Sequence, residues 1–280
     1  ETTFPQASFD LCPIADGGEG TAQAMTAALA GEWTRGTTQD AQGRPLEAPF
    51  GWVASSATAI MEMSAASGLA IVQDLKLNPF TASTLGTGIL IQSAHAKGAR
   101  RILIGIGGSA TNDGGLGVAI ALGYTFRKAG HAFTPTLETI LEADQVEKPA
   151  SLPACELIVA CDVDNPLLGP RGATRVYGPQ KGVTDFIWFE QRLAHLADLV
   201  RRDLGNDPRE APGAGAAGGL GRRGRPLRAE RQQAVGLGLG AGVDRDLMAG
   251  LEQVGDHALP HHPGADERDF HGKDENRRED

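Results

Sequence analysis

Hydrophobic residues in the first 221 positions follow two spacings, which predict buried strands and amphipathic helices in alternation. Continuous apolar runs predict strands over residues 8–14, 58–63, 101–106 and 156–161. Intervals of three and four predict a helix over 185–204, with Gly205 as its C-cap. Shorter helices are expected over 21–29, from Thr84 to Gly98, and from Gly115 towards Gly123. This alternation predicts an α/β fold with a largely parallel sheet.

The loop of residues 105–115 joins a predicted strand to a predicted helix and holds the densest group of polar side chains. Gly107 and Gly108 leave room for a ligand to approach the backbone, and a helix N-terminus attracts negative charge. Four polar residues follow: Ser109, Thr111, Asn112 and Asp113. Hydroxyls donate to phosphate oxygens, and a carboxylate holds Mg²⁺ or accepts a hydroxyl proton. The pattern suits phosphate binding, although an ordinary turn rich in small residues has the same composition.

Two better-known nucleotide motifs fit this loop poorly. The order GxxxxGK[ST] of a P-loop is absent. Residues 105–110 do match GxGxxA after a strand, as in dinucleotide-binding proteins. That fingerprint also needs an acidic residue about 20 positions further on, and residues 128–133 supply none. A nicotinamide cofactor is therefore not expected.

A second glycine-rich turn covers residues 16–21 and leads into the first predicted helix. Asp16 and Glu19 flank Gly17 and Gly18, and Thr21 opens the helix. Carboxylates at such a turn suit Mg²⁺ or a substrate hydroxyl. An N-cap with acidic residues in the first turn gives the same pattern, so both interpretations stay open.

A third turn follows the strand over 156–161. Asp162 lies at the carboxyl end of that strand, where open α/β sheets bind ligands, and Asn165 follows it. Gln180 and Lys181 stand shortly after, between proline and glycine turn residues, and a lysine there can meet a phosphate or carboxylate. The alternative is that Asp162 and Asn165 form turns while Lys181 is solvated.

Composition narrows the classes of protein. The chain has 26 Lys and Arg against 35 Asp and Glu, a net charge of −9, which disfavours general binding to nucleic acid or anionic membranes. A small anionic substrate needs only a local positive pocket. Cys12, Cys155 and Cys161 are irregularly spaced and are expected to be free thiols in a reducing compartment. No apolar run approaches the roughly 20 residues of a membrane span.

Five segments carry a resemblance to a known family. They are PIADGGEGT at 13–21, IMEMSAASGLAIV at 60–72, IGIGGSATNDGGLG at 104–117, ACDVDNPLLGPRGATRVYGPQKG at 160–182 and PGAGAAGGLG at 212–221. Together they resemble the first class of bacterial glycerate kinases. The resemblance implies ATP-dependent phosphorylation of D-glycerate with Mg²⁺ in the cytoplasm, and 2-phosphoglycerate is favoured over the 3-phosphate as product. The resemblance does not decide whether the protein forms a homo-oligomer, so this possibility stays open.

The resemblance also implies two α/β domains with the active site in the cleft between them. One is Rossmann- or flavodoxin-like and discontinuous, with residues 1–50 as its first part. The other is an inserted mixed-sheet domain over 51–221 that carries the glycine-rich loop. Residues 222–280 stand where the rest of the first domain is expected.

Motif position and chemistry suggest roles for individual residues. Asp113 and Asp16 are candidates for the base and for Mg²⁺ ligands, and Lys181 for neutralising a phosphate or the substrate carboxylate. The expected phosphate- and substrate-binding residues are Gly17, Gly18, Glu19, Thr21, Gly107, Gly108, Ser109, Thr111, Asn112, Asp162, Asn165 and Gln180. Which carboxylate is the base stays open.

Both ends of the chain depart from the family pattern. A DSFKGSLS-like segment is expected before the first glycine turn, and an ITGEGR-type motif near the C-terminus; neither is present. About 37% of residues 222–280 are charged, against about 18% before them, which favours disorder. We therefore expect a missing N-terminal segment and a reading-frame slip after Gly221. The alternative function is an impaired remnant that binds ligand without turnover.

Overall fold

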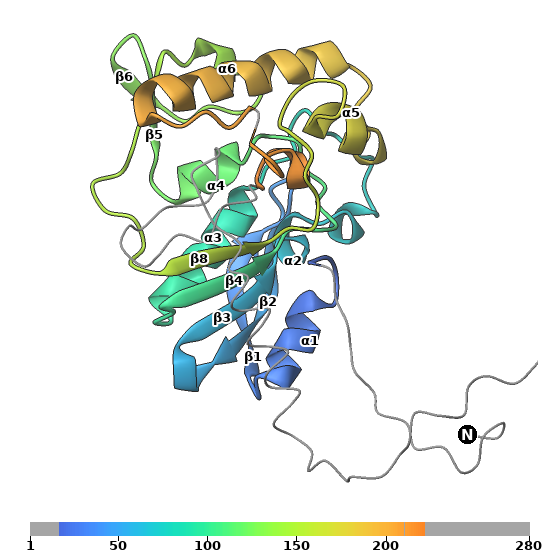
Figure 1. Ribbon diagram of the computed structural model, residues 1–280, viewed down its shortest axis with the longest axis vertical. Coiled ribbons are helices and arrows are strands. Elements are labelled where there is room, and N and C mark those ends of the chain that lie inside the picture. Colours follow the sequence, from blue (N-terminus) through green and yellow to red (C-terminus); the bar gives the residue numbers. More distant parts are fainter. Residues whose placement is uncertain (1–16, 210, 222–280) are drawn as a thin grey trace, which may run out of the picture. The chain divides into compact units, whose positions relative to one another are not determined.

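A five-stranded mixed sheet organises the described part of the chain (Figure 1). The structure is a computed structural model and describes residues 17–209 and 211–221. The strands, in spatial order, are β1 (Glu32–Gln39), β2 (Pro45–Val53), β3 (Thr58–Glu62), β4 (Arg101–Gly105) and β8 (Glu156–Ala160). β1, β2 and β3 pair in antiparallel fashion, whereas β3, β4 and β8 are parallel. The carboxyl ends of β3, β4 and β8 therefore lie at one edge of the sheet.

Helices cover both faces of this sheet (Figure 1). α1 (Thr21–Ala28) lies so close to β2 that a Cβ atom on Gly51 would collide with the side chain of Thr26. α3 (Leu85–Ala96) lies against the opposite face, where a Cβ atom on Gly36 of β1 would meet Ser93. α2 (Ser64–Ser67) follows β3 and contacts α3. The layers enclose a core of fully buried side chains that includes Phe50, Met61, Leu90, Ile102 and Ile104.

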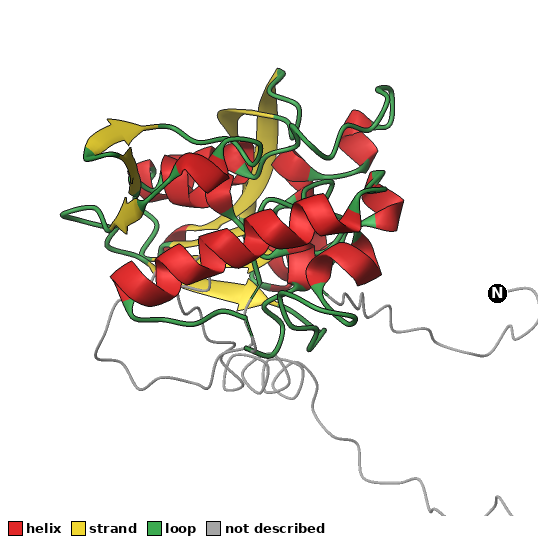
Figure 2. Cartoon of the chain, turned by 90° about the horizontal axis from the view of Figure 1, so that it is seen from above, coloured by secondary structure: helices red, strands yellow, loops and turns green. Residues whose placement is uncertain are grey.

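A second, smaller layer lies on the β8 side of the sheet (Figure 1). α4 (Leu116–Ala121) packs on α3 and leads into an antiparallel sheet of β6 (His131–Phe133), β5 (Thr125–Lys128) and β7 (Gln145–Glu147), in that order. α6 (Phe186–Leu204) packs on β7 through a buried face that contains Phe189, Leu193, Leu196 and Val200. Figure 2 looks down on α6, which is at the top of Figure 1. The remaining short helices are η1 (Ala54–Ser56), η2 (Ala70–Val72), η3 (Ile140–Glu142), α5 (Ala173–Tyr177), η4 (Pro179–Lys181) and η5 (Ala216–Gly218).

Most of the elements predicted from the sequence are present. The helices α1, α3, α4 and α6 and the strands β3, β4 and β8 all lie where the hydrophobic pattern places them. The prediction of a largely parallel sheet is wrong for its first two strands, because β1 and β2 form an antiparallel hairpin. The strand predicted over residues 8–14 lies outside the described residues.

The structure also bears on the expected domain boundary and on membrane-spanning helices. The expected domain boundary after residue 50 falls inside β2, and the sheet continues across it. The division into two domains itself stays a prediction. In the part of the chain that the structure describes, no helix has the length and apolar character needed to cross a membrane.

Asp185 is the N-cap of α6. Its carboxylate accepts a hydrogen bond from the backbone N–H of Trp188, at 2.9 Å, which satisfies one of the unpaired donors at the helix N-terminus. We expect Asp185→Ala to lower the free energy of unfolding by about 1 kcal/mol. Asp185→Asn keeps an acceptor oxygen and is the matched control. Chemical denaturation measures both, and equal losses in the two variants would contradict the capping role.

Candidate functional site

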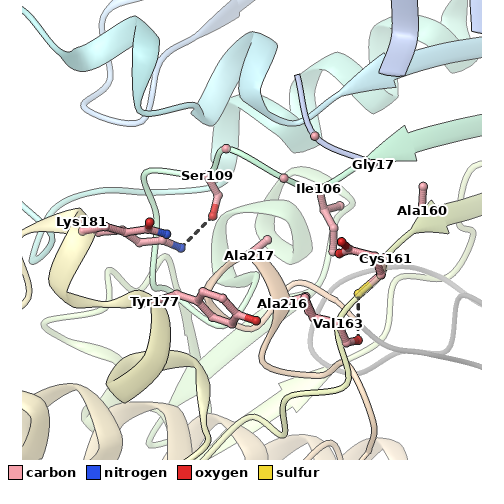
Figure 3. Close-up of a pocket in the computed structure, with 15 residues that line it drawn as sticks. Gly17, Ile106, Ser109, Ala160, Cys161, Val163, Tyr177, Lys181, Ala216 and Ala217 are labelled. Atoms are coloured by element: carbon pink, nitrogen blue, oxygen red, sulfur yellow. Dashed lines mark hydrogen bonds between the residues drawn. The ribbon is translucent and has the colours of Figure 1, made fainter. Parts of the chain in front are cut away.

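A pocket of about 250 Å³ opens at the carboxyl ends of β4 and β8 (Figure 3). Ligands of open α/β sheets bind at this edge, outside the ends of the strands. Three of the predicted glycine-rich or polar turns meet there. The lining residues are Gly17, Gly18, Ile106, Gly107, Gly108, Ser109, Ala160, Cys161, Asp162, Val163, Tyr177, Gln180, Lys181, Ala216 and Ala217.

Two glycine turns form one wall of the pocket through direct backbone contact. The N–H of Gly107 donates to the carbonyl oxygen of Gly17 at 3.0 Å. A Cβ atom on Gly105 would lie 2.6 Å from that same oxygen, and a Cβ atom on Gly107 would lie 2.5 Å from the Cα atom of Gly18. Such distances are too short for any side chain. Glycine is therefore required where the two turns meet, and the motifs at 16–21 and 105–115 act as one unit.

This contact leads to a second prediction. We expect Gly107→Ala to push the turn at Gly17 and Gly18 away, to cost about 1–3 kcal/mol of stability, and to weaken phosphate-ligand binding at least tenfold. Gly130→Ala is the control, because a Cβ atom on Gly130 would have open space around it; its positive φ (+79°), which Gly107 does not share, adds only a local backbone strain away from the pocket. Calorimetric titration with ATP compares the two variants. Unchanged affinity in Gly107→Ala would show that the contact does not shape the site.

Lys181 extends from η4 to the floor of the pocket and is only 2% exposed. Its Nζ atom donates a hydrogen bond to Ser109 Oγ at 2.7 Å (Figure 3). It donates a second one to the carbonyl oxygen of Thr111 at 2.6 Å. Burial lowers the pKa of Lys181 to about 7, although the negative charge of Asp113 acts in the opposite direction. The alternative of a solvated lysine is therefore wrong, because the side chain is enclosed and reaches back to the loop of residues 105–115.

Asp113 lies beneath the pocket and does not line it. Its Oδ2 atom accepts hydrogen bonds from the backbone N–H and the hydroxyl of Thr84 and from the N–H of Gly117, and its Oδ1 atom accepts one from the N–H of Gly115. The carboxylate thus binds the N-termini of both α3 and α4. Complete burial raises the pKa of Asp113, and these hydrogen bonds act against the rise. The hydrogen bonds that the Asp113 carboxylate accepts therefore indicate a structural role, in which it links the two helices.

Several other polar residues expected at the site are turned away from the pocket, and three of them hydrogen-bond to neighbouring residues. Thr111 and Asn112 are fully buried outside the pocket lining, and Asn112 Nδ2 donates to Thr174 Oγ1 at 3.0 Å. Thr21 Oγ1 accepts a hydrogen bond from the N–H of Gly17 at 3.0 Å and so fixes the first turn. Asn165 Oδ1 accepts one from Tyr177 Oη at 2.6 Å. These residues support the walls of the pocket from behind.

The structure thus divides the expected site residues into three groups. Those that line the pocket are Gly17, Gly18, Gly107, Gly108, Ser109, Asp162, Gln180 and Lys181. Those that do not line it are Glu19, Thr21, Thr111, Asn112, Asp113 and Asn165. Asp16 lies outside the described residues.

Sequence reasoning missed part of the pocket wall. Tyr177 lines the pocket from α5, and Ala216 and Ala217 line it from η5 (Figure 3). The segment at 211–221 reaches this place because Gly218 accepts a hydrogen bond from the N–H of Gly114, and Gly215 donates one to Asn165. The signal available was the run of small residues PGAGAAGGLG at 212–221, whose glycines permit this close packing.

Metal-binding capacity rests on few residues. No cluster of three or more His, Cys, Asp or Glu side chains suitable for a metal occurs in residues 17–209 and 211–221. Asp162 is an exposed carboxylate on the pocket wall, and one carboxylate together with substrate phosphates is a common way to hold Mg²⁺. Asp113 does not fit that role, because its oxygens are occupied by the donors of α3 and α4.

Comparison with known proteins points to one family. Residues 1–237 match the Glycerate kinase family. The chain is 44% identical over 227 residues to the glycerate kinase of Bacillus subtilis strain 168, and the match covers 79% of this chain and 59% of that protein. It is 42% identical over 224 residues to the glycerate 2-kinase of Escherichia coli strain K12, with 78% and 59% covered.

A solved structure agrees with these matches. A crystal structure of a protein provisionally assigned as glycerate kinase 2, from Salmonella typhimurium LT2, is similar with a TM-score of 0.71 and 40% sequence identity. The match covers 78% of this chain and 61% of that one. The chain therefore spans about three-fifths of the length of these relatives. The family match continues beyond Gly221 to residue 237. The expected reading-frame slip after Gly221 stays a prediction.

Proposed function

The chain belongs to the glycerate kinase family, and from this premise we propose that it takes part in transfer of the γ-phosphoryl group of ATP to a hydroxyl group of D-glycerate. The observation that carries the proposal is the pocket at the ends of β4 and β8, where two glycine turns, a serine hydroxyl and a buried lysine meet. Its volume suits a small organic acid with a phosphate group and is too small to enclose a whole nucleotide.

Backbone groups of the loop at 107–109 support phosphate binding. Gly108 has φ +69°, and among the described hydrogen bonds none uses the N–H of Gly108 or of Ser109. Successive N–H groups at a left-handed turn form a concave site for anions. Phosphoryl transfer depends mainly on positioning and on stabilising charge on the moving oxygens. These N–H groups and the hydroxyl of Ser109 are the donors that we assign to the phosphate.

Two residues with ionisable side chains, Lys181 and Asp162, complete the proposed site. Lys181 places an amine at the floor of the pocket, next to Ser109. Asp162 would hold Mg²⁺ beside the nucleotide phosphates, and the ion would neutralise part of their charge. For Asp16, a role as Mg²⁺ ligand or base stays a prediction.

The finer parts of the expectation remain part of this proposal. We propose that the protein belongs to the first class of glycerate kinases, forms 2-phosphoglycerate and acts in the cytoplasm. We also propose that a second, Rossmann- or flavodoxin-like domain lies across a cleft. Whether the protein forms a homo-oligomer stays open. The pocket gives the carboxyl and hydroxyl groups of a three-carbon acid several donors within a small space, which supports glycerate rather than a larger substrate.

A coupled assay of ADP release with ATP, Mg²⁺ and D-glycerate tests the proposed activity, and calorimetry measures ATP binding in parallel. We expect turnover that depends on glycerate and that falls in Ser109→Ala. Ser56→Ala, in η1, is the control because Ser56 is exposed and does not line the pocket. ATP binding without any turnover would favour the alternative of an impaired remnant, and absence of both would overturn the proposal.

A further inference from the structure

Transfer of a phosphoryl group to a hydroxyl releases a proton, and the pocket must provide a group that accepts it. The carboxylates of the described site serve this purpose poorly. Asp113 is beneath the pocket, and its oxygens already accept four hydrogen bonds. Asp162 is exposed, so it is better suited to a cation than to storing a proton away from water. The other ionisable groups of the pocket are therefore the remaining candidates.

Lys181 has the surroundings of a neutral amine. The described residues provide no ion pair to its Nζ atom, whose partners are a hydroxyl and a backbone carbonyl oxygen. An ammonium group that is buried without a carboxylate partner loses its hydration without compensation, which favours the uncharged form. The charged or titratable groups around it are Asp113 on the loop below, and Cys161, Asp162 and Tyr177 in the pocket lining.

Ser109 connects this amine to the pocket. Its hydroxyl lines the cavity and lies 2.7 Å from Lys181 Nζ (Figure 3). The carbonyl oxygen of Thr111 can only accept, so it fixes one N–H of the amine and orients the remaining valences. When the amine is neutral, the direction of this contact reverses: the Ser109 hydroxyl donates to the lone pair of Nζ while its oxygen accepts from a second hydroxyl. The pair therefore forms a path from a substrate hydroxyl to a buried nitrogen.

We propose that Lys181, acting through the hydroxyl of Ser109, accepts the proton that leaves the substrate hydroxyl during phosphoryl transfer. The inference rests on the proposed kinase function. In the step, the substrate oxygen forms a bond to the γ-phosphorus of ATP, and the bond from that phosphorus to the bridging oxygen breaks, so ADP leaves with the electron pair. The substrate proton passes to Ser109 Oγ while the Ser109 proton passes to Lys181 Nζ. The resulting ammonium releases its proton to solvent after the product leaves.

The test compares the pH dependence of turnover with the titration of Lys181 itself. The chain has six lysines, so ¹³C labelling of lysine gives a simple NMR spectrum in which the signal lost in Lys181→Met is that of Lys181. Lys148→Met is the control, since Lys148 is exposed and away from the pocket. ADP release with ATP, Mg²⁺ and D-glycerate is measured on the same samples between about pH 5.5 and 9.5.

A proton acceptor and a fixed positive charge predict opposite results. If Lys181 accepts the proton, kcat rises with pH, about tenfold per unit below the NMR midpoint of Lys181, and levels off above it. If Lys181 only neutralises a phosphate, kcat falls above that midpoint. We also expect Lys181→Arg, which keeps the charge but cannot lose it, to lose at least a hundredfold in kcat, and Ser109→Ala to remove the link between kcat and the midpoint.

The outcomes separate this inference from the proposed function. Turnover that falls with pH, or a Lys181 midpoint near the ordinary lysine value of about 10.4, overturns the proton-acceptor role and leaves the kinase function standing. Absence of any glycerate-dependent ADP release overturns the kinase function, and this inference fails with it. A misfolded arginine variant does not affect the result, because the wild-type profile and midpoint alone decide the sign.

Discussion

Replacing Asp113 with alanine is expected to lower the free energy of unfolding by about 3–5 kcal/mol. The carboxylate joins the N-terminus of α3 to that of α4 by accepting hydrogen bonds from Thr84, Gly115 and Gly117. Thr84 Oγ1 in turn accepts the N–H of Val118, so the two helix ends share one network. Alanine would leave several buried N–H donors without acceptors, and each such donor costs about 1–3 kcal/mol.

Asp113→Asn is the informative companion. Its amide oxygen can replace Oδ2, but its NH₂ group would face the N–H of Gly115, two donors against each other. We expect a smaller loss, about 1–3 kcal/mol, and a kcat that changes little when the folded fraction is taken into account. Denaturant titration combined with the ADP-release assay measures both. A stable variant whose kcat drops by orders of magnitude would instead support the role as base or Mg²⁺ ligand that the sequence suggested.

Hydrophobic spacing predicts two kinds of element well: helices that bury one face, and strands that are buried on both faces. The helix α6 shows its buried stripe in sequence, and β3, β4 and β8 are short apolar runs. The hairpin was missed because β1 reads EWTRGTTQ, with few apolar residues to reveal a strand. Its inner face is formed largely by small groups such as Gly36, which permits close packing of Ser93. Such burial comes from neighbouring elements, and a local pattern cannot show it.

Motifs predict which turns form the site but not which side chains face the ligand. The glycine turns at 16–21 and 105–115 and the strand end at 162 do meet around one pocket. Within the loop, however, Ser109 lines the pocket whereas Asp113 is turned to the helices. Both side chains are polar and lie four positions apart, and only the packing of α3 and α4 distinguishes them. Lys181 is similar, since its burial depends on contact with a loop 70 residues earlier.

The stability of the protein is expected to rise with pH between about 7 and 9 because of Lys181. Burial lowers the pKa of Lys181 to about 7 in the folded protein, whereas an unfolded lysine keeps its ordinary value near 10.5. Between these values the unfolded chain binds more protons than the folded one, so the free energy of unfolding increases as the pH rises. The expected gain over these two pH units is about 2 kcal/mol.

Lys181→Met removes this titrating group and is expected to abolish the rise. The range below pH 9 is chosen because burial also raises the pKa values of Cys155 and Tyr124. For those two groups the unfolded state loses its proton first, so each lowers stability at higher pH. Lys148→Met is again the control, because an exposed lysine should leave the slope unchanged. Urea denaturation at a series of pH values gives the slopes, and equal slopes in wild type and Lys181→Met would mean that Lys181 stays charged in the folded protein.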